Sequence, residues 1–350
     1  MDLSIAAILA QDGLSSGAIY ALLALALVLV FSVTRVILIP QGEFVAFGAL
    51  TMAALQTGQY PHTATLLVVL GVLAFLREAA GTLRHAPRRA LAGRILVPAF
   101  ARLVGAPLVL MVAVRLVAPL ALSIPVQVAL SLAVVVPMGP LLYRLAFEPL
   151  AEASVLVLLI VAVGVHLTLT GAGLVMFGAE GSRTLPFTDA RFALGSMAIS
   201  GQSMVVLATA AVLILALYVY FDRTLAGKAL RATAVNRLGA QLVGIGAIAA
   251  ARMAFTLAAA IGAICGILIA PLTTIYYDSG FLIGLKGFVG AIIGGLASYP
   301  LAAAGAILVG LLEAYSAFWA SAFKEVIVFT LIIPVLLWRS LRSTPTDGDQ

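Results

Sequence analysis

Long apolar runs without a single charge follow one another through most of this sequence. The first extends from about Leu14 to Ile37 and contains no charged residue before Arg35. A stretch of about 20 apolar residues is long enough to cross the hydrocarbon core of a bilayer as a helix. With 63% hydrophobic and only 10% charged residues, the chain also has too little polar surface for a water-soluble domain. We therefore predict an all-α polytopic membrane protein, a single transmembrane domain over residues 1–350.

Counting every apolar segment predicts about 9 to 11 transmembrane helices, the lower number applying if one short pair is re-entrant. The segments lie at about 14–37, 43–57, 63–76, 103–122, 125–145, 154–177, 202–221, 253–275, 282–299, 301–320 and 326–338. The odd number of crossings predicts that the two termini lie on opposite sides of the membrane.

Basic residues gather in two segments between these spans. Residues 77–102 carry six arginines against Glu78, and residues 222–252 carry four arginines and one lysine against Asp222. Because cytoplasmic loops are enriched in Lys and Arg, we predict that both segments and the tail 339–350 are cytoplasmic, with the N-terminus outside a bacterial-type inner membrane. Anionic membrane lipids can also contact the first segment. Topology explains the net charge of +6 without a nucleic-acid partner.

A proline and a glycine interrupt apolar sequence just after the first span, at Pro40-Gln41-Gly42-Glu43. Broken helices with a polar residue are typical of transport pathways, because non-helical backbone at membrane depth must line a cavity or be buried in protein. Glu43 has an equally good alternative as a cap of the second helix at the interface. His166 is expected to be a packed core residue, because no second titratable group accompanies it.

The sequence carries no recognisable catalytic or cofactor signature. It has no Walker A sequence, no metal-binding His or Cys spacing, and one cysteine, Cys265, inside an apolar run. We expect no cofactor and no metal, and an integral membrane enzyme would need a cluster of titratable residues that is missing. What remains is a pore, an ion-coupled carrier, or one part of an ATP-driven assembly.

The basic segment 222–252 favours the third of these. It contains an amphipathic helical pattern whose apolar face comprises Ala232, Val235, Gly239, Leu242 and Val243, and Gly244 and Gly246 end it. A cytoplasmic helix of this kind is most simply a docking surface. The alternative is a solvated loop with a helix that lies on the membrane.

Several short motifs occur in a characteristic order along the chain. They are GLSSGAIYAL at 13–22, QGEF at 41–44, FEPL at 147–150, RATA at 231–234, GLKGF at 284–288 and GGL at 294–296. In this combination the sequence resembles the permease subunits of branched-chain amino-acid ABC importers, a group that includes urea and amide importers. The resemblance implies a non-enzymatic permease that forms the pathway for small amino acids, urea or short amides. It also implies separate ATPase subunits, a second homologous permease subunit and an extracytoplasmic solute-binding protein.

The resemblance assigns expected roles to individual residues. Permeases of this type carry a cytoplasmic Glu-Ala-Ala motif, then three residues and Gly, which forms the coupling helix on the ATPase. The matching positions are Leu238, Gly239, Ala240 and Gly244. Leucine thus replaces the glutamate and glycine the first alanine, so Asn236 or Arg237 is expected to orient the helix instead.

The translocation pathway is expected to involve Gln41, Gly42, Glu43, Gly284, Lys286 and Phe288. Lys286 has an equally good alternative as an interfacial anchor whose charge reaches the head groups. The rival function is a stand-alone ion-coupled transporter or channel that relies on Glu43, Lys286 and Glu313.

One segment departs from the family pattern. About 65 extra residues, roughly 61–125, separate the QGEF motif from the FEPL motif and comprise a span, a basic loop and a span. Two crossings preserve the topology on both sides. We expect this insert to be a peripheral helical hairpin, facing lipid or a subunit, outside the pathway.

Overall fold

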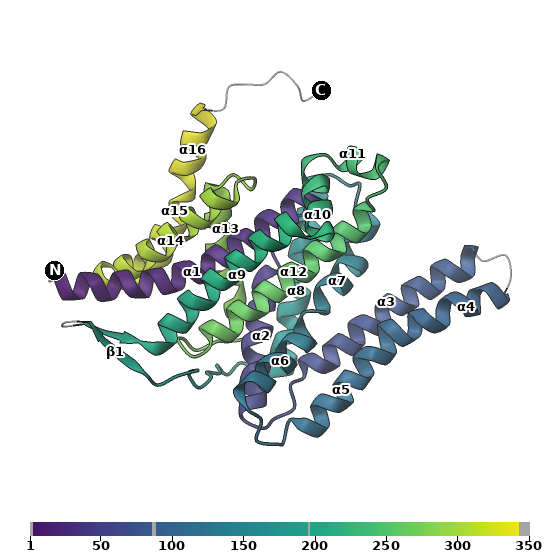
Figure 1. The fold of residues 1–350 in the computed structure, drawn as a ribbon, viewed down its shortest axis with the longest axis horizontal. Coiled ribbons are helices and arrows are strands. Elements are labelled where there is room, and N and C mark those ends of the chain that lie inside the picture. Colours follow the sequence, from purple (N-terminus) through teal and green to yellow (C-terminus); the bar gives the residue numbers. More distant parts are fainter. Residues whose placement is uncertain (1–2, 86–88, 195–196, 343–350) are drawn as a thin grey trace.

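The computed structural model describes residues 3–85, 89–194 and 197–342. Within these residues the chain is a bundle of helices with one small β-hairpin (Figure 1). The predicted all-α polytopic class is confirmed. Residues 1–2, 86–88, 195–196 and 343–350, which include part of the first basic segment and most of the tail, lie outside the described part of the chain.

Helices make up nearly all of the regular structure. In chain order, the α-helices are α1 (Leu3–Thr34), α2 (Gln41–Gln56), α3 (Thr63–His85), α4 (Arg89–Phe100), α5 (Ala106–Val117), α6 (Ile124–Val135), α7 (Met138–Leu142), α8 (Val155–Phe177), α9 (Gly201–Arg223), α10 (Leu225–Val235), α11 (Arg237–Leu242), α12 (Ala247–Ile269), α13 (Ser279–Ile293), α14 (Tyr299–Trp319), α15 (Lys324–Thr330) and α16 (Ile332–Arg342). Two π-helical turns, Ala101–Gly105 and Tyr143–Phe147, and two 3₁₀ turns, Glu148–Leu150 and Ser321–Phe323, connect some of them. Strands β1 (Arg191–Leu194) and β2 (Met197–Ser200) pair antiparallel, with Arg191 opposite Ser200.

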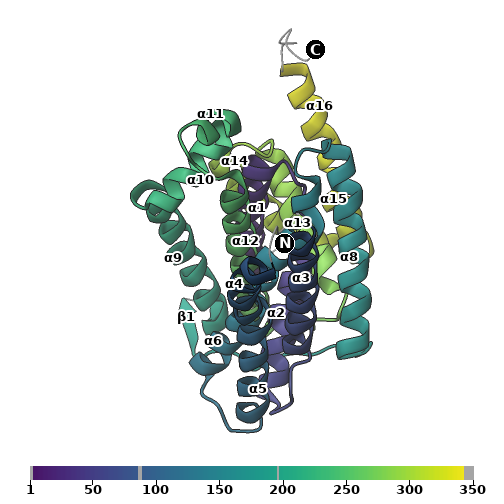
Figure 2. The same ribbon diagram turned by 90° about the vertical axis from the view of Figure 1, so that its right-hand side faces the viewer.

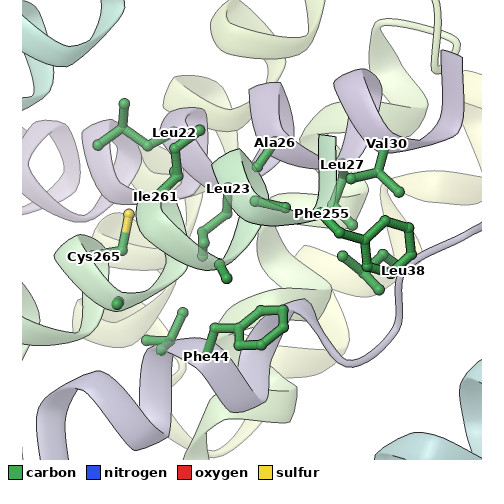
Figure 3. Packing of buried hydrophobic residues seen from close by; sticks show 14 of the residues in the cluster. Leu22, Leu23, Ala26, Leu27, Val30, Leu38, Phe44, Phe255, Ile261 and Cys265 are labelled. Carbon is green, nitrogen blue, oxygen red and sulfur yellow. The ribbon is translucent and has the colours of Figure 1, made fainter. Parts of the chain in front are cut away.

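The core of the bundle is formed by α1, α2, α12, α13 and α14. Figure 3 shows side chains of α1, α2 and α12 converging on one another, with Leu23, Phe44 and Phe255 among them. Small residues let these helices approach closely, which is how helices associate where lipid removes the hydrophobic driving force. At Gly17, for example, an added Cβ would lie 2.9 Å from Ile307 Cα of α14. Cys265 is buried in this core as a free thiol.

Eight helical segments in the described residues are long and apolar enough to cross a membrane. The expected spans near 43–57 and 282–299 became α2 and α13, of 16 and 15 residues, which is short for a crossing. Both are packed inside the bundle, so neither has to match the thickness of the hydrocarbon layer. The expected last span is broken at Leu331, between α15 and α16.

Helices at the edge of the bundle are much less buried than the core. α3 packs antiparallel against α4 and α5, and this hairpin projects away from the core (Figure 1). α8 and α9 stand on opposite sides of the bundle (Figure 2). Only a minor part of α3, α5, α8 and α9 is buried, whereas most of α1 is. These exposed apolar faces are suited to lipid or to another subunit.

Candidate functional site

The two short core helices, α2 and α13, meet at their first turns. A Cβ atom placed on Gly42 would lie 2.0 Å from the carbonyl oxygen of Gly280. Gly284, one turn further along α13, faces the same residue, and its Cβ would lie 3.1 Å from Gly42 Cα. Backbone contact this close excludes any side chain. The QGEF and GLKGF motifs, far apart in sequence, therefore lie side by side.

α2 begins in the interior of the bundle. The chain leaves α1 at Thr34, runs without helical structure through residues 35–40 and starts α2 at Gln41. Gln41 is buried, and its Nε2 donates to the carbonyl oxygen of Ala258, midway along α12, at 3.0 Å. A helix that begins here directs its free N–H groups and the positive end of its dipole into the protein. The predicted break at Pro40 is confirmed.

Glu43, which is buried, and His166, which is partly buried, form a pair beside this junction. His166 Nδ1, on α8, lies 2.6 Å from Glu43 Oε1, and the ring of Phe281 on α13 stacks on the imidazole with 4.5 Å between centroids. Glu43 is 1% exposed, and its Oε2 has no hydrogen-bond partner among the described residues. The expectation that His166 has no titratable companion is wrong. Glu43 also lies in the first turn of α2, so a capping role by charge is compatible with its pairing to His166. Tertiary packing joins residues 123 positions apart.

A second charged cluster is centred on Lys286, two residues beyond Gly284 on α13. Its Nζ lies 2.6 Å from Glu313 Oε1 and 3.1 Å from Glu325 Oε1. Tyr20 of α1 donates to Glu313 Oε2 at 2.7 Å. The Lys286 side chain is 7% exposed, so it does not extend to the head groups, and the alternative of an interfacial anchor is wrong. Intramembrane charges are expensive and mark functional sites more often than they add stability.

A cavity of about 450 Å³ lies between α1, α13 and α14, with Lys286 and Glu313 in its wall. Its other charged lining residues are Asp12 and Lys324. Hydroxyl groups of Ser15, Ser16 and Ser279 line one part, and Leu282 and Ile283 another. The volume lies within the range of small-molecule sites. The cavity therefore combines both signs of charge, hydroxyl groups and an aliphatic wall.

The remaining pathway candidates have structural contacts. Gln41 and Glu43 are engaged with α12 and α8, and Phe288 is partly buried against the core. Of the six residues predicted for the pathway, Lys286 lines the cavity, while Gly42 and Gly284 form the helix junction beside it. Sequence reasoning missed Tyr20 and Glu325 as partners of this cluster.

The basic segment 222–252 folds as two helices, α10 and α11, and not as one amphipathic helix. The chain is extended at Asn236 (φ −150°, ψ 100°), whose side chain caps α11 by accepting from Gly239 N at 2.8 Å. Asn is among the strongest N-cap residues, so Asn236 in the sequence could have indicated that a new helix starts here. α11 ends at Leu242, and Gly244 follows with φ +87°.

The two residues expected to orient α11 both make contacts within the chain. Asn236 forms the cap, and Arg237 Nη1 donates to the carbonyl oxygen of Ala151 at 3.1 Å. Ala240 is buried against the body of the protein, whereas Leu238, Leu242 and Val243 are largely exposed. We call these three residues the α11 face. It is apolar although it lies outside the spans.

The FEPL motif itself is held by a further contact from the segment 222–252. Arg252, near the start of α12, contacts Glu148 with three hydrogen bonds of 2.8 to 3.1 Å. A forked guanidinium–carboxylate contact of this kind fixes geometry as well as adding energy. In the preceding π-helical turn, Arg144 pairs with Glu78 of α3. A continuous series of contacts thus links α11, the 148–151 turn and the projecting hairpin.

Comparison with known proteins gives the family of this chain. Residues 100–336 match the model of the branched-chain amino acid transport system permease component. The match begins beyond α1, α2 and α3, so the motifs at 13–22 and 41–44 lie outside it. No solved structure matches the chain.

Curated relatives carry similar descriptions. The high-affinity branched-chain amino acid transport system permease protein BraD of Pseudomonas aeruginosa is 28% identical over 203 residues, 56% of this chain and 66% of that protein. The corresponding permease protein LivH of Escherichia coli is 28% identical over 201 residues, 55% of this chain and 65% of that protein. The alignments therefore span slightly less than two thirds of these relatives.

Proposed function

The chain belongs to the family of branched-chain amino acid transport system permease components, and on that premise we propose that it is the permease subunit of an ATP-driven ABC importer. Its substrate is a branched-chain or other small amino acid, with urea and short amides as alternatives. The observation that carries the proposal is the Lys286–Glu313 ion pair in the wall of a cavity between helices of the bundle.

The lining of this cavity supports an amino acid as substrate. An amino acid carries an ammonium and a carboxylate group. A wall that contains both a cationic and an anionic side chain can therefore pair with both groups of the substrate. Lys286 takes the carboxylate, and Glu313 or Asp12 takes the ammonium. Leu282 and Ile283 offer apolar contact to an aliphatic side chain.

Coupling to ATP hydrolysis is assigned to α11. The α11 face docks on a separate ATPase subunit, with Gly239 allowing close approach and Gly244 ending the helix. A charged contact with the ATPase is not needed to orient α11, because Arg237 already bonds α11 to the carbonyl oxygen of Ala151 in the same chain. Movement of the ATPase is then transmitted through the 148–151 turn into the bundle, since these contacts must move together.

The remaining partners follow from alternating access. A second homologous permease subunit completes the pathway, and an extracytoplasmic solute-binding protein delivers the substrate near residues 178–201 and 276–278. This arrangement requires the N-terminus outside and the segment 222–252 and the tail 339–350 inside a bacterial-type inner membrane. The excess of basic residues in 222–252 supports that orientation.

The segment 61–125 is a peripheral hairpin outside the pathway. Its support is the projecting pair α3 and α4–α5 with its small buried fraction. Deletion of the hairpin should leave insertion, assembly and specific uptake intact. Lost uptake in a correctly assembled complex would show that the hairpin takes part in transport.

Co-purification with the ATPase subunits tests the coupling role. Leu238→Glu places a charge on the α11 face and should release the ATPase from the affinity-purified permease. Leu185→Glu, at an equally exposed leucine in the 178–201 loop, is the matched control and should retain it. Ala240 is less suitable for this test because it is buried, so a charge there would disturb the fold.

A stand-alone ion-coupled carrier is the second candidate, and the Glu43–His166 pair is the observation that favours it. A buried carboxylate–imidazole pair can carry a proton. Uptake that persists without any ATPase subunit and follows a proton gradient would replace the ABC proposal with this one.

A further inference from the structure

Two adjoining grooves lie on the side of the bundle where α9 stands away from α1 and α14. The first, of about 580 Å³, is lined by apolar and aromatic residues apart from Asp222 and Arg231. The second, of about 530 Å³, adds Ser32 and Arg35. Both grooves share Leu29, Phe221, Arg231 and Tyr299 in their walls. They therefore form one continuous depression with an apolar arm and a basic end.

The apolar arm covers about two thirds of the depth of one leaflet of a bilayer. On α9 it extends from Ile214 to Phe221, about 10 Å along a helix that rises 1.5 Å per residue. One leaflet of the hydrocarbon core is about 15 Å deep. On the opposite wall it follows Leu25 and Leu29 of α1. The arm therefore lies within the apolar spans and reaches their end.

The basic end lies where these spans leave the membrane. Arg35 follows the end of α1, and Arg231 lies on α10 after the end of α9. Arg231 has one distant acidic neighbour, Asp222 at 4.0 Å, and its side chain is 64% exposed. Arg35 has no ion-pair partner within the described part of the chain. Two guanidinium groups are thus available to an anion at the edge of the bilayer.

We propose that this depression, the α1–α9 groove, binds one anionic phospholipid. An acyl chain occupies the apolar arm, and the phosphate contacts Arg35 and Arg231. Tyr299, in both walls, lies at the level where aromatic rings favour the interface. A soluble anion would leave the apolar arm empty, and a lipid without an anionic group would give Arg35 no partner. Only an amphiphile with a negative head group matches both ends.

The site is independent of which solute is transported. α10 leads directly into α11, so an occupied groove would hold the start of the coupling segment against α1. Lipid would then stabilise the purified chain even without its partners. The test therefore uses the full chain in detergent and does not depend on uptake.

Native mass spectrometry and thermal stability measure the binding. Dioleoyl-phosphatidylglycerol should bind as a resolved adduct and raise the denaturation midpoint, and dioleoyl-phosphatidylcholine should do so far less. Arg35→Asn with Arg231→Gln should weaken phosphatidylglycerol binding about 30-fold, from about 1 kcal/mol for each basic residue near an anionic surface. Asn is chosen at position 35 because the backbone there has φ 58°, which Asn tolerates well.

Lys228→Gln is the matched control, since Lys228 lies on α10 with Arg231, is exposed and lines neither groove. It should bind the lipid as the wild type does. Ala303→Phe, which fills the apolar arm, should weaken binding while keeping both arginines. Glycerophosphoglycerol, which has no acyl chains, should give no shift.

Three results would overturn the proposal. The first is equal binding of phosphatidylcholine and phosphatidylglycerol. The second is unchanged binding by both the double arginine variant and Ala303→Phe. The third is a dimer of this chain whose crosslinks run through the groove, because a second copy would then be the occupant.

Discussion

The contact between Gly42 and Gly280 makes the sharpest structural prediction. In Gly42→Ala the new Cβ would start 2.0 Å from a backbone oxygen, whereas an ordinary contact needs about 3.4 Å, so α2 and α13 must separate by about 1.4 Å. Both sides of the contact are backbone, and no side-chain rotamer can relieve it. Overpacking of this kind costs about 1 to 3 kcal/mol. Alanine has a higher helix propensity than glycine, which offsets at most about 1 kcal/mol of this cost.

Gly171→Ala is the matched control, because a Cβ at Gly171 on α8 meets nothing within 4 Å. Gly171→Ala gains helix propensity without a steric clash, so it should be neutral or slightly stabilising. Thermal denaturation of the purified proteins, followed by tryptophan fluorescence, compares the two variants. At about 2 to 4 °C per kcal/mol, Gly42→Ala should denature several degrees below Gly171→Ala. Equal midpoints would refute the close approach of the two short helices.

Three further outcomes are expected. Lys286→Met removes the cation that pairs with both Glu313 and Glu325 and should cost about 3 to 5 kcal/mol; adding Glu313→Leu should restore only part of the denaturation midpoint, because Glu325 stays unpaired, and should not restore uptake. Glu43→Gln keeps a hydrogen bond to His166 and should change stability by less than about 1 kcal/mol, while Glu43→Leu should cost about 1 to 3 kcal/mol. Arg237→Gln should leave ATPase binding intact and lower uptake per ATP hydrolysed, because α11 loses its tether.

The helical membrane class could be predicted from the sequence because it depends on local composition. Apolar runs, the broken helix at Pro40 and the basic segments are all continuous in the chain. The site could not be predicted in the same way, since its pairs join distant positions. Glu43 meets His166, and Glu313 meets Lys286 and Tyr20, only after α1, α2, α8, α13 and α14 pack.

The break between α10 and α11 shows a different limit of prediction from the sequence. Periodicity of apolar residues predicted one helix, but the periodic face crosses Asn236, where the backbone is extended. The capping preference of Asn competes with helix continuation, and here the cap prevails. The buried position of Ala240 follows from this turn, so the exposed face of α11 could not be read from the pattern alone.

ATP-dependent uptake by the reconstituted assembly tests the central claim most directly. The chain would be combined in proteoliposomes with its ATPase subunits, its partner permease and its binding protein, and uptake of radiolabelled leucine, isoleucine and valine measured. We predict uptake that requires hydrolysable ATP and is lost in Leu238→Glu and in the Lys286→Met, Glu313→Leu double variant. Uptake that proceeds at the same rate without ATPase subunits would contradict the account.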